Sequence, residues 1–265
     1  MTWLFRALVM VATTYLTLLV ILWSFQSHFI YPAPQDVPSL TPGYEEVSLR
    51  TSDGLTLRAF YREAEPGMPT TVYFHGNGGT LEMASTSNIG FVNAGFGVLL
   101  VEYRGYGGNP GQPSEEGFYR DGEAAMDWLV GEGLPLEQVV FVGNSIGSGV
   151  ATEMAVRHRP AALVLIAPFT SLPAVAGNNL WWMPAHSLVN DQYRNAEKIA
   201  ELQIPVLIQH GDADALIPHE HGKRLSRIAP DATFQSFAGS GHGLTFEPRS
   251  QEARRDWILD LVGAD

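Results

Sequence analysis

A serine between two glycines is the feature of this chain most typical of chemistry. Ser145 lies in the run Gly-Asn-Ser-Ile-Gly at 143–147, after a strand-like stretch at 138–142 and before a helix-like stretch at 148–158. Glycines on both sides allow a sharp strand-to-helix turn that a Cβ atom would obstruct. Such a turn holds the hydroxyl out of the sheet and within reach of a base, so Ser145 is the candidate nucleophile. The alternative is a Gly-Ser loop that only joins strand to helix.

A candidate base and two candidate acids follow later strands. His242 lies in a glycine-rich loop after the strand expected at 232–238. An imidazole there can take the serine proton, and a buried carboxylate can fix its tautomer and stabilise the imidazolium. Asp212 and Asp214 both follow the strand expected at 204–210. We prefer Asp214, which has room to bend back toward the site, whereas Asp212 is close enough to the strand end to serve as a turn or cap residue.

A second glycine-rich turn offers a place for developing negative charge. The run His-Gly-Asn-Gly-Gly at 75–79 follows the strand expected at 70–74. Backbone N–H groups in such a turn can converge on an oxyanion, and the amides of Asn77 and Ile146 are the candidate donors. The alternative is a tight turn that caps a helix. His75 itself is expected to be a structural hydrogen-bonding residue.

Three other groups of residues are considered as parts of a functional site. Arg104 follows the strand expected at 97–103 and is expected to pair with acids and tie loops together beneath the site. The apolar run at 181–183 (Trp-Trp-Met) fits an acyl pocket, a membrane-facing surface or lid packing equally well. His219 and His221 are two residues apart and would lie on different faces of a helix, which argues against a metal site.

Composition excludes several functional classes. The chain has 265 residues, of which 45% are hydrophobic and 17% charged, and this fits one α/β domain with a small extension. A net charge of −12 argues against nucleic-acid binding, which needs a basic face. The chain has no cysteine, so it has no disulfide, thiolate metal site or cysteine nucleophile.

The N-terminal segment is typical of a membrane anchor. Residues 7–25 carry no charge, and as a helix they would span roughly 28 Å. Trp3 and Trp23 lie at the two ends, where interfacial aromatic residues are expected. The alternative is a cleaved signal peptide, but no typical cleavage site follows directly. Arg6 precedes the segment and the next cation is Arg50, so we expect a single-pass protein with its catalytic domain outside the cytoplasm, periplasmic if bacterial.

The elements that must position these residues form an α/β pattern. The expected strands are 44–50, 55–62, 70–74, 97–103, 138–142, 161–167, 204–210 and 232–238, and a helix capped by Ser114 is expected at 115–130. From the third strand on, strands alternate with helices, which predicts a mostly parallel eight-stranded sheet with helices on both faces.

The chain divides into three expected parts. Residues 1–28 are the anchor, and residues 44–265 are the α/β domain, with a small lid insert at 169–201. Residues 29–43 form a proline-rich linker, expected to be stiff and to hold the domain off the bilayer.

Five motifs together resemble the α/β-hydrolase superfamily. They are HGNGG, EYRGYGG, GNSIG, GDADALIP and GSGH. The order of Ser145, Asp214 and His242 along the chain is also the order expected of that fold. With the N-terminal anchor and the FIYP segment, nearly the whole chain from Phe29 is similar to membrane-anchored serine hydrolases of the bud-emergence-homologue type.

The resemblance carries over to individual residues. In that family the acid stands three residues after the glycine of an HG-x-x-D run, which implies Asp214, and the histidine of the G-x-x-H loop is His242. Two positions depart from the family pattern. Glu102 stands where aspartate is common, and Asn109 lies in the region where a serine is expected. These departures touch supporting contacts and loop shape.

The sequence therefore predicts a serine hydrolase of acyl esters or thioesters that works through an acyl-enzyme. It would need no cofactor or metal and would act on a small-molecule or lipid-like acyl substrate. The alternatives are a peptidase of the same fold, which usually carries a larger lid, and a catalytically silent membrane-anchored scaffold.

Overall fold

The computed structural model describes residues 2–263 and contains one eight-stranded sheet in the order β1-β2-β4-β3-β5-β6-β7-β8. The strands are β1 (Glu45–Arg50), β2 (Thr56–Arg62), β3 (Thr70–Phe74), β4 (Gly97–Val101), β5 (Val139–Asn144), β6 (Ala162–Ile166), β7 (Val206–Gly211) and β8 (Ala232–Phe237). β2 pairs antiparallel with β1 and β4, and every other neighbouring pair is parallel. The expected mostly parallel sheet is confirmed.

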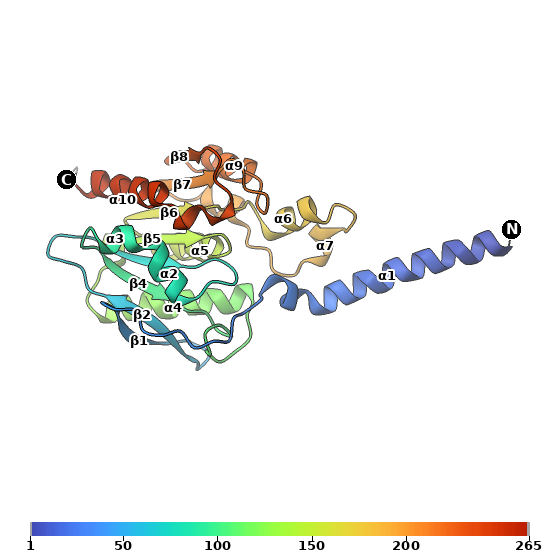
Figure 1. Ribbon diagram of the computed structural model, residues 1–265, viewed down its shortest axis with the longest axis horizontal. Helices are drawn as coiled ribbons and strands as arrows, with labels where there is room; N and C mark the ends of the chain where they lie inside the picture. The colour runs from blue at the N-terminus through green and yellow to red at the C-terminus, as the bar shows by residue number, and fades with distance from the viewer. Residues whose placement is uncertain (1, 264–265) are drawn as a thin grey trace.

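Helices cover both faces of this sheet (Figure 1). The helices of the described chain are α1 (Thr2–Ile30), α2 (Leu81–Ser87), α3 (Ile89–Val92), α4 (Glu115–Gly131), α5 (Gly147–His158), α6 (Leu172–Asn179), α7 (Ala185–Leu188), α8 (Asn195–Ile199), α9 (Glu220–Ile228) and α10 (Pro248–Val262), with 3₁₀ turns η1 (Leu136–Gln138) and η2 (His242–Phe246); α1, α6 and α7 lie outside the two layers that cover the sheet. The side chain of Ser114 accepts a hydrogen bond from Gly117 N, so it caps α4 as expected.

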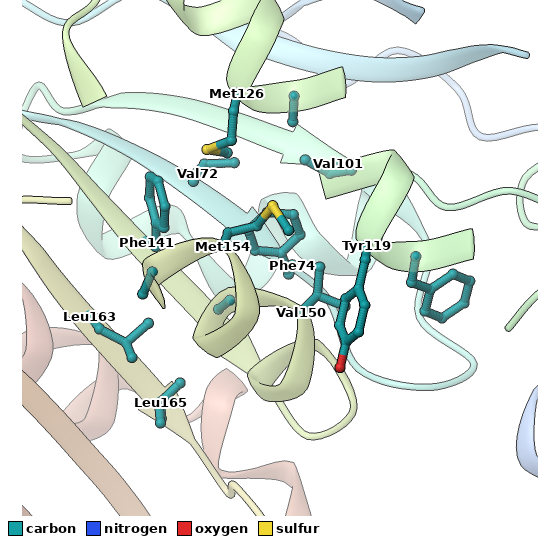
Figure 2. Packing of buried hydrophobic residues seen from close by; sticks show 14 of the residues in the cluster. Val72, Phe74, Val101, Tyr119, Met126, Phe141, Val150, Met154, Leu163 and Leu165 are labelled. Atoms are coloured by element: carbon teal, nitrogen blue, oxygen red, sulfur yellow. The ribbon is translucent and has the colours of Figure 1, made fainter. Parts of the chain in front are cut away.

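Side chains of the buried strands alternate between two cores. Phe141, Leu163 and Leu165 point to one face, where they pack with Met126 of α4 and Met154 of α5 (Figure 2). Their neighbours along β5 and β6 point to the other face and pack with residues of α2, α3 and α10. Strands buried on both faces are mostly apolar, which explains runs such as Gly-Val-Leu-Leu-Val in β4.

The N-terminal helix α1 extends away from the domain, and α6 and α7 project along the same side (Figure 1). By length and composition, α1 could cross a membrane, with a mean hydropathy of 2.1 over its most apolar window. The two segments touch: Tyr15 donates a hydrogen bond to Trp182 O (3.0 Å), and the Gln26 side chain bonds Leu188 O (3.2 Å) and Asn190 N (2.8 Å).

The segment after α1 was expected to be a stiff linker that holds the domain off the bilayer, but it packs on the domain. Tyr31 is buried, and its hydroxyl donates to Asp191 (2.6 Å) and lies 3.1 Å from the Tyr193 hydroxyl. Further along, Gly107 N donates to Pro34 O (2.8 Å). The proline-rich stretch therefore lies against the domain, because its carbonyl groups and its tyrosine find partners there, and α1 ends directly at the domain surface.

The turn between β5 and α5 is expected to tolerate only glycine at 147. A Cβ on Gly147 would lie 2.1 Å from Phe74 O, a backbone atom of a central strand that cannot yield. We expect Gly147→Ala to lower the free energy of unfolding by about 3 kcal/mol or more. The matched control is Gly131→Ala at the end of α4, where a Cβ would meet nothing within 4 Å. Denaturant unfolding of the full chain in detergent micelles, followed by circular dichroism, compares the two; equal stabilities would contradict the prediction.

Candidate active site

Ser145 occupies a strained turn between β5 and α5. Its φ is +52°, a left-handed conformation that side-chain-bearing residues rarely adopt. The turn is held by Ser145 N, which donates to Ile166 O of the neighbouring strand (2.9 Å). Gly143 and Gly147 let the start of α5 lie against β5 and β3, since a Cβ at either would strike backbone at 2.4 or 2.1 Å. The strain is of the kind found where a side chain must be presented for chemistry.

The structure brings the three predicted polar residues into one hydrogen-bonded chain. Ser145 Oγ lies 3.0 Å from His242 Nε2, and His242 Nδ1 lies 2.8 Å from Asp214 Oδ2. A carboxylate only accepts hydrogen bonds, so Nδ1 carries the ring proton and donates a hydrogen bond to Asp214. Nε2 is then left with a lone pair facing the serine hydroxyl. This is the arrangement that a general base needs.

Of the two acids considered from the sequence, Asp214 faces the histidine and Asp212 does not. Asp212 Oδ1 accepts from Gly239 N (2.7 Å) and so caps the neighbouring loop, the role that its place at the strand end suggested. Asp214 is buried, and its Oδ1 accepts from the N–H groups of Leu216 and Ile217, both at 2.9 Å. These two amides leave Oδ2 directed at His242.

The surroundings of Asp214 keep it ionised. Burial raises the pKa of this carboxyl, but hydrogen bonds from His210, His242 and Ile217 N outweigh burial and hold the pKa well below its usual range. His210 is a contributor that we did not predict. It is fully buried, and its Nε2 lies 3.5 Å from Asp214 Oδ2 and 2.9 Å from Ile217 O. Its position at the end of β7, four residues before the acid, was the available signal.

The two residues whose amides are predicted to bind an oxyanion, Asn77 and Ile146, line the same cavity as Ser145. Within residues 2–263, neither Asn77 N nor Ile146 N donates a hydrogen bond. The glycine-rich turn approaches closely, since a Cβ on Gly76 would lie 3.4 Å from Ser145 Cβ. The side chain of Asn77 is fixed by Tyr106, whose hydroxyl donates to Oδ1 (2.7 Å), and by a hydrogen bond to Ile30 O at the end of α1.

Beneath the site, charged residues tie the loops together. His75 Nε2 lies 2.8 Å from Glu102 Oε1, and both side chains are buried. Arg104 bridges Asp121 and Asp53, each at 2.8 Å, and so performs the loop-tying role expected of it. Asn109, the other departure from the family pattern, donates to Glu102 O (3.3 Å) and lies in the same supporting layer. None of these groups reaches the serine hydroxyl.

Two cavities adjoin Ser145. The first, which we call the inner cavity, has a volume of about 220 Å³ and apolar walls that include Ile30, Phe169 and Val175. The second, the loop-side cavity, has a volume of about 240 Å³ and is lined by residues that include His75, Asn77 and His242. Ser145 and Asn77 line both, and Ile146 lines the inner one. A substrate carbonyl at Ser145 would therefore have one space for each of its two substituents.

Of the run at 181–183, Trp181 and Trp182 line neither cavity. Trp181 is 84% exposed, and the Trp182 ring packs edge-on against Tyr15 of α1. Among the described residues, no group of three or more His, Cys, Asp or Glu side chains is placed to hold a metal ion. His221 instead bonds Thr170 (2.9 Å).

Comparison with known proteins places this geometry in context. A profile of the alpha/beta hydrolase fold matches residues 69–190. An uncharacterized protein of Mycobacterium tuberculosis is 36% identical over 248 residues, which cover 89% of this chain and 88% of that protein. The alpha/beta hydrolase domain-containing protein WAV2 of Arabidopsis thaliana is 29% identical over 257 residues, covering 84% and 82%. An esterase of Pyrococcus furiosus shares the fold, with a TM-score of 0.68 at 19% identity over 86% of this chain and 95% of that one.

Proposed function

Because the chain belongs to the α/β-hydrolase superfamily, we propose that it is a serine hydrolase that cleaves acyl ester or thioester bonds through an acyl-enzyme on Ser145. The observation that carries the proposal is the continuous chain from Ser145 Oγ through His242 to Asp214, at 3.0 and 2.8 Å. Ser145 Oγ donates to His242 Nε2 and His242 Nδ1 donates to Asp214, so the serine proton has a base to which it can move.

The proposed reaction has two halves. His242 Nε2 takes the hydroxyl proton while Ser145 Oγ attacks the acyl carbonyl, and the amides of Asn77 and Ile146 stabilise the oxyanion. His242 then protonates the leaving oxygen or sulfur, which departs and leaves the acyl group on Ser145. Water, activated by the same histidine, attacks the acyl-enzyme and releases the acid. Asp214 stabilises the imidazolium in both halves, for which its depressed pKa suits it.

We further propose that α1 remains attached and anchors the protein in a membrane. Cleavage at the end of α1 would remove Ile30, whose carbonyl bonds Asn77 and which lines the inner cavity. It would also remove Tyr15, the partner of Trp182. The single cation before the apolar stretch, Arg6, favours a catalytic domain outside the cytoplasm, periplasmic if the source is bacterial.

A fluorophosphonate probe tests the proposal against a silent scaffold. The full chain in detergent micelles should form one covalent adduct, and peptide mapping should locate it on Ser145. Ser148 is an internal control, because it is also buried nearby but its hydroxyl already donates to Ser145 O (2.6 Å) and has no histidine beside it. A folded protein that resists the probe would favour the scaffold. Cleavage of peptides, but not of esters, would favour the peptidase.

A further inference from the structure

The inner cavity adjoins a third cavity that lies along α1. This outer cavity has a volume of about 320 Å³ and is walled by α1 and by the insert at 169–201. The inner and outer cavities share four lining residues: Phe29, Ile30, Ala176 and Val189. Because the two spaces share these walls, they adjoin, and an apolar route from Ser145 to the side of α1 would pass between these four residues. We call the shared residues the neck.

The side chains that line the outer cavity are almost all apolar. The outer cavity is lined by apolar side chains such as Leu22, Leu180 and Met183, and Gln26 is its one polar lining residue within the part of the chain that the structure describes. Gln26 is already occupied, since its amide bonds Asn190 N, Leu188 O and Trp23 O. A group that fills this space gains apolar contact and no hydrogen bonds, which suits an alkyl chain.

The outer cavity lies beside the last part of α1, from Leu22 to Ile30, and overlaps the uncharged stretch 7–25 at Leu22 and Trp23. The insert follows α1 as far as Tyr15, which donates to Trp182 O and contacts the Trp182 ring. Tyr15 lies fifteen residues before the end of the helix, or roughly 22 Å along its axis. The tip of the insert is thus beside the uncharged residues 7–25, with Trp181 almost fully exposed. If α1 spans a bilayer, the insert enters it too, and the outer cavity is reached from the hydrocarbon.

The loop-side cavity indicates the kind of leaving group. None of the described residues that line it is a lysine or arginine. A phosphate in that space would lose its hydration without gaining a cation, which is unfavourable. The net charge of −12 also repels anionic headgroups. An uncharged alcohol such as glycerol has no ionic charge to desolvate and is not repelled by the acidic protein. The volume of the loop-side cavity, about 240 Å³, also favours a small alcohol over a polypeptide.

We propose that the inner and outer cavities hold the acyl chain of an uncharged bilayer glycerolipid, which enters sideways between α1 and the insert. The proposal rests on the proposed function at Ser145. Hydrolysis then breaks the bond between the acyl carbon and the glycerol oxygen, His242 protonates that oxygen, and water supplies the hydroxyl of the released fatty acid. A chain that had to reach Ser145 through water would lose about fourfold in occupancy for each exposed methylene. The apolar route removes that loss.

The test compares a long chain with a short one on the same alcohol. The full chain is reconstituted in phosphatidylcholine vesicles that contain 1-palmitoylglycerol, and 1-acetylglycerol is supplied in solution to a parallel sample. Release of palmitate and acetate gives a ratio for each variant. Ala176→Phe fills the neck and should lower the palmitate-to-acetate ratio by about tenfold or more. Ala174→Phe is the matched control, since Ala174 is on the same helix but lines none of the three cavities, and it should leave the ratio unchanged.

The outcomes separate this inference from the proposed function. If Ala176→Phe releases neither acid, Leu180→Lys, which puts a charge in the outer cavity, decides in the same assay. A ratio that neither variant lowers, in an enzyme that hydrolyses both esters, overturns the route while the hydrolase stands. Preference for 1-palmitoyl lysophosphatidylglycerol, or for an S-palmitoyl peptide in the same vesicles, overturns the uncharged glycerolipid. If the wild type releases no more than Ser145→Ala from any of these esters, the proposed function has failed and this inference with it.

Discussion

Replacing Ser145 with alanine is expected to lower kcat by about 10⁶-fold, to the level left by binding and oxyanion stabilisation alone. Within residues 2–263, the Ser145 hydroxyl is the only hydrogen-bond partner of His242 Nε2. Alanine keeps a Cβ and meets the same backbone restriction at φ +52° as serine, so the fold and its stability should be retained. Hydrolysis of p-nitrophenyl butyrate by the full chain in detergent micelles measures the loss.

The control for this change is Ser148→Ala in the next turn. Ser148 donates to Ser145 O and is as buried as the candidate nucleophile, but it faces no base. We expect its loss to change kcat by less than about tenfold, the effect of one supporting hydrogen bond. Retention of more than about one hundredth of wild-type kcat by a folded Ser145→Ala protein would contradict the assignment of the nucleophile.

Asp214→Asn is expected to lower kcat by about 10⁴-fold with little change in the fold. The reason lies in the two amides that hold Asp214 Oδ1. Because Leu216 N and Ile217 N both donate to that oxygen, the asparagine carbonyl must take its place, and the NH₂ group then faces His242 Nδ1. Nδ1 would have to become an acceptor, which moves the ring proton to Nε2 and removes the base from Ser145.

Asp212→Asn is the matched control, two residues away, where the side chain accepts from Gly239 N and does not face His242. It should keep kcat within a few-fold of wild type. The depressed pKa of Asp214 means that its carboxylate stays charged at every pH above about 4, so protonation of Asp214 does not reduce activity in that range. An inactive Asp212→Asn beside an active Asp214→Asn would reverse the choice of acid.

Much of the fold could be predicted because its signals are local. β3 was expected at 70–74 and is observed there, since a run of β-branched and aromatic residues ends at a glycine turn. Ser114 and the periodic residues after it predicted α4 to within one residue. The glycines at 143 and 147 predicted the turn at Ser145, because a sharp strand-to-helix turn leaves no room for a Cβ at either position.

The contacts that could not be predicted join residues far apart in the sequence. Tyr15 with Trp182 and Tyr31 with Asp191 are separated by about 160 residues or more. Neither pair has a spacing that marks it, and a proline-rich stretch is compatible with both a free spacer and a docked segment. We expected a stiff linker that holds the domain off the bilayer, and the structure shows a docked segment instead. The support that His210 gives Asp214 was missed because a buried histidine is more often a core residue, and only the bend after β7 reveals the contact.

The most direct test of the account is to capture the acyl-enzyme. The full chain in detergent micelles is mixed with excess p-nitrophenyl acetate, quenched in acid within the first turnover, and examined by mass spectrometry of its peptides, with p-nitrophenol followed in parallel. The account predicts a burst of p-nitrophenol equal to the amount of enzyme and an acetyl group on Ser145, both absent from Ser145→Ala. Steady hydrolysis that Ser145→Ala retains, with no acetyl group on Ser145 of the wild type, would contradict it.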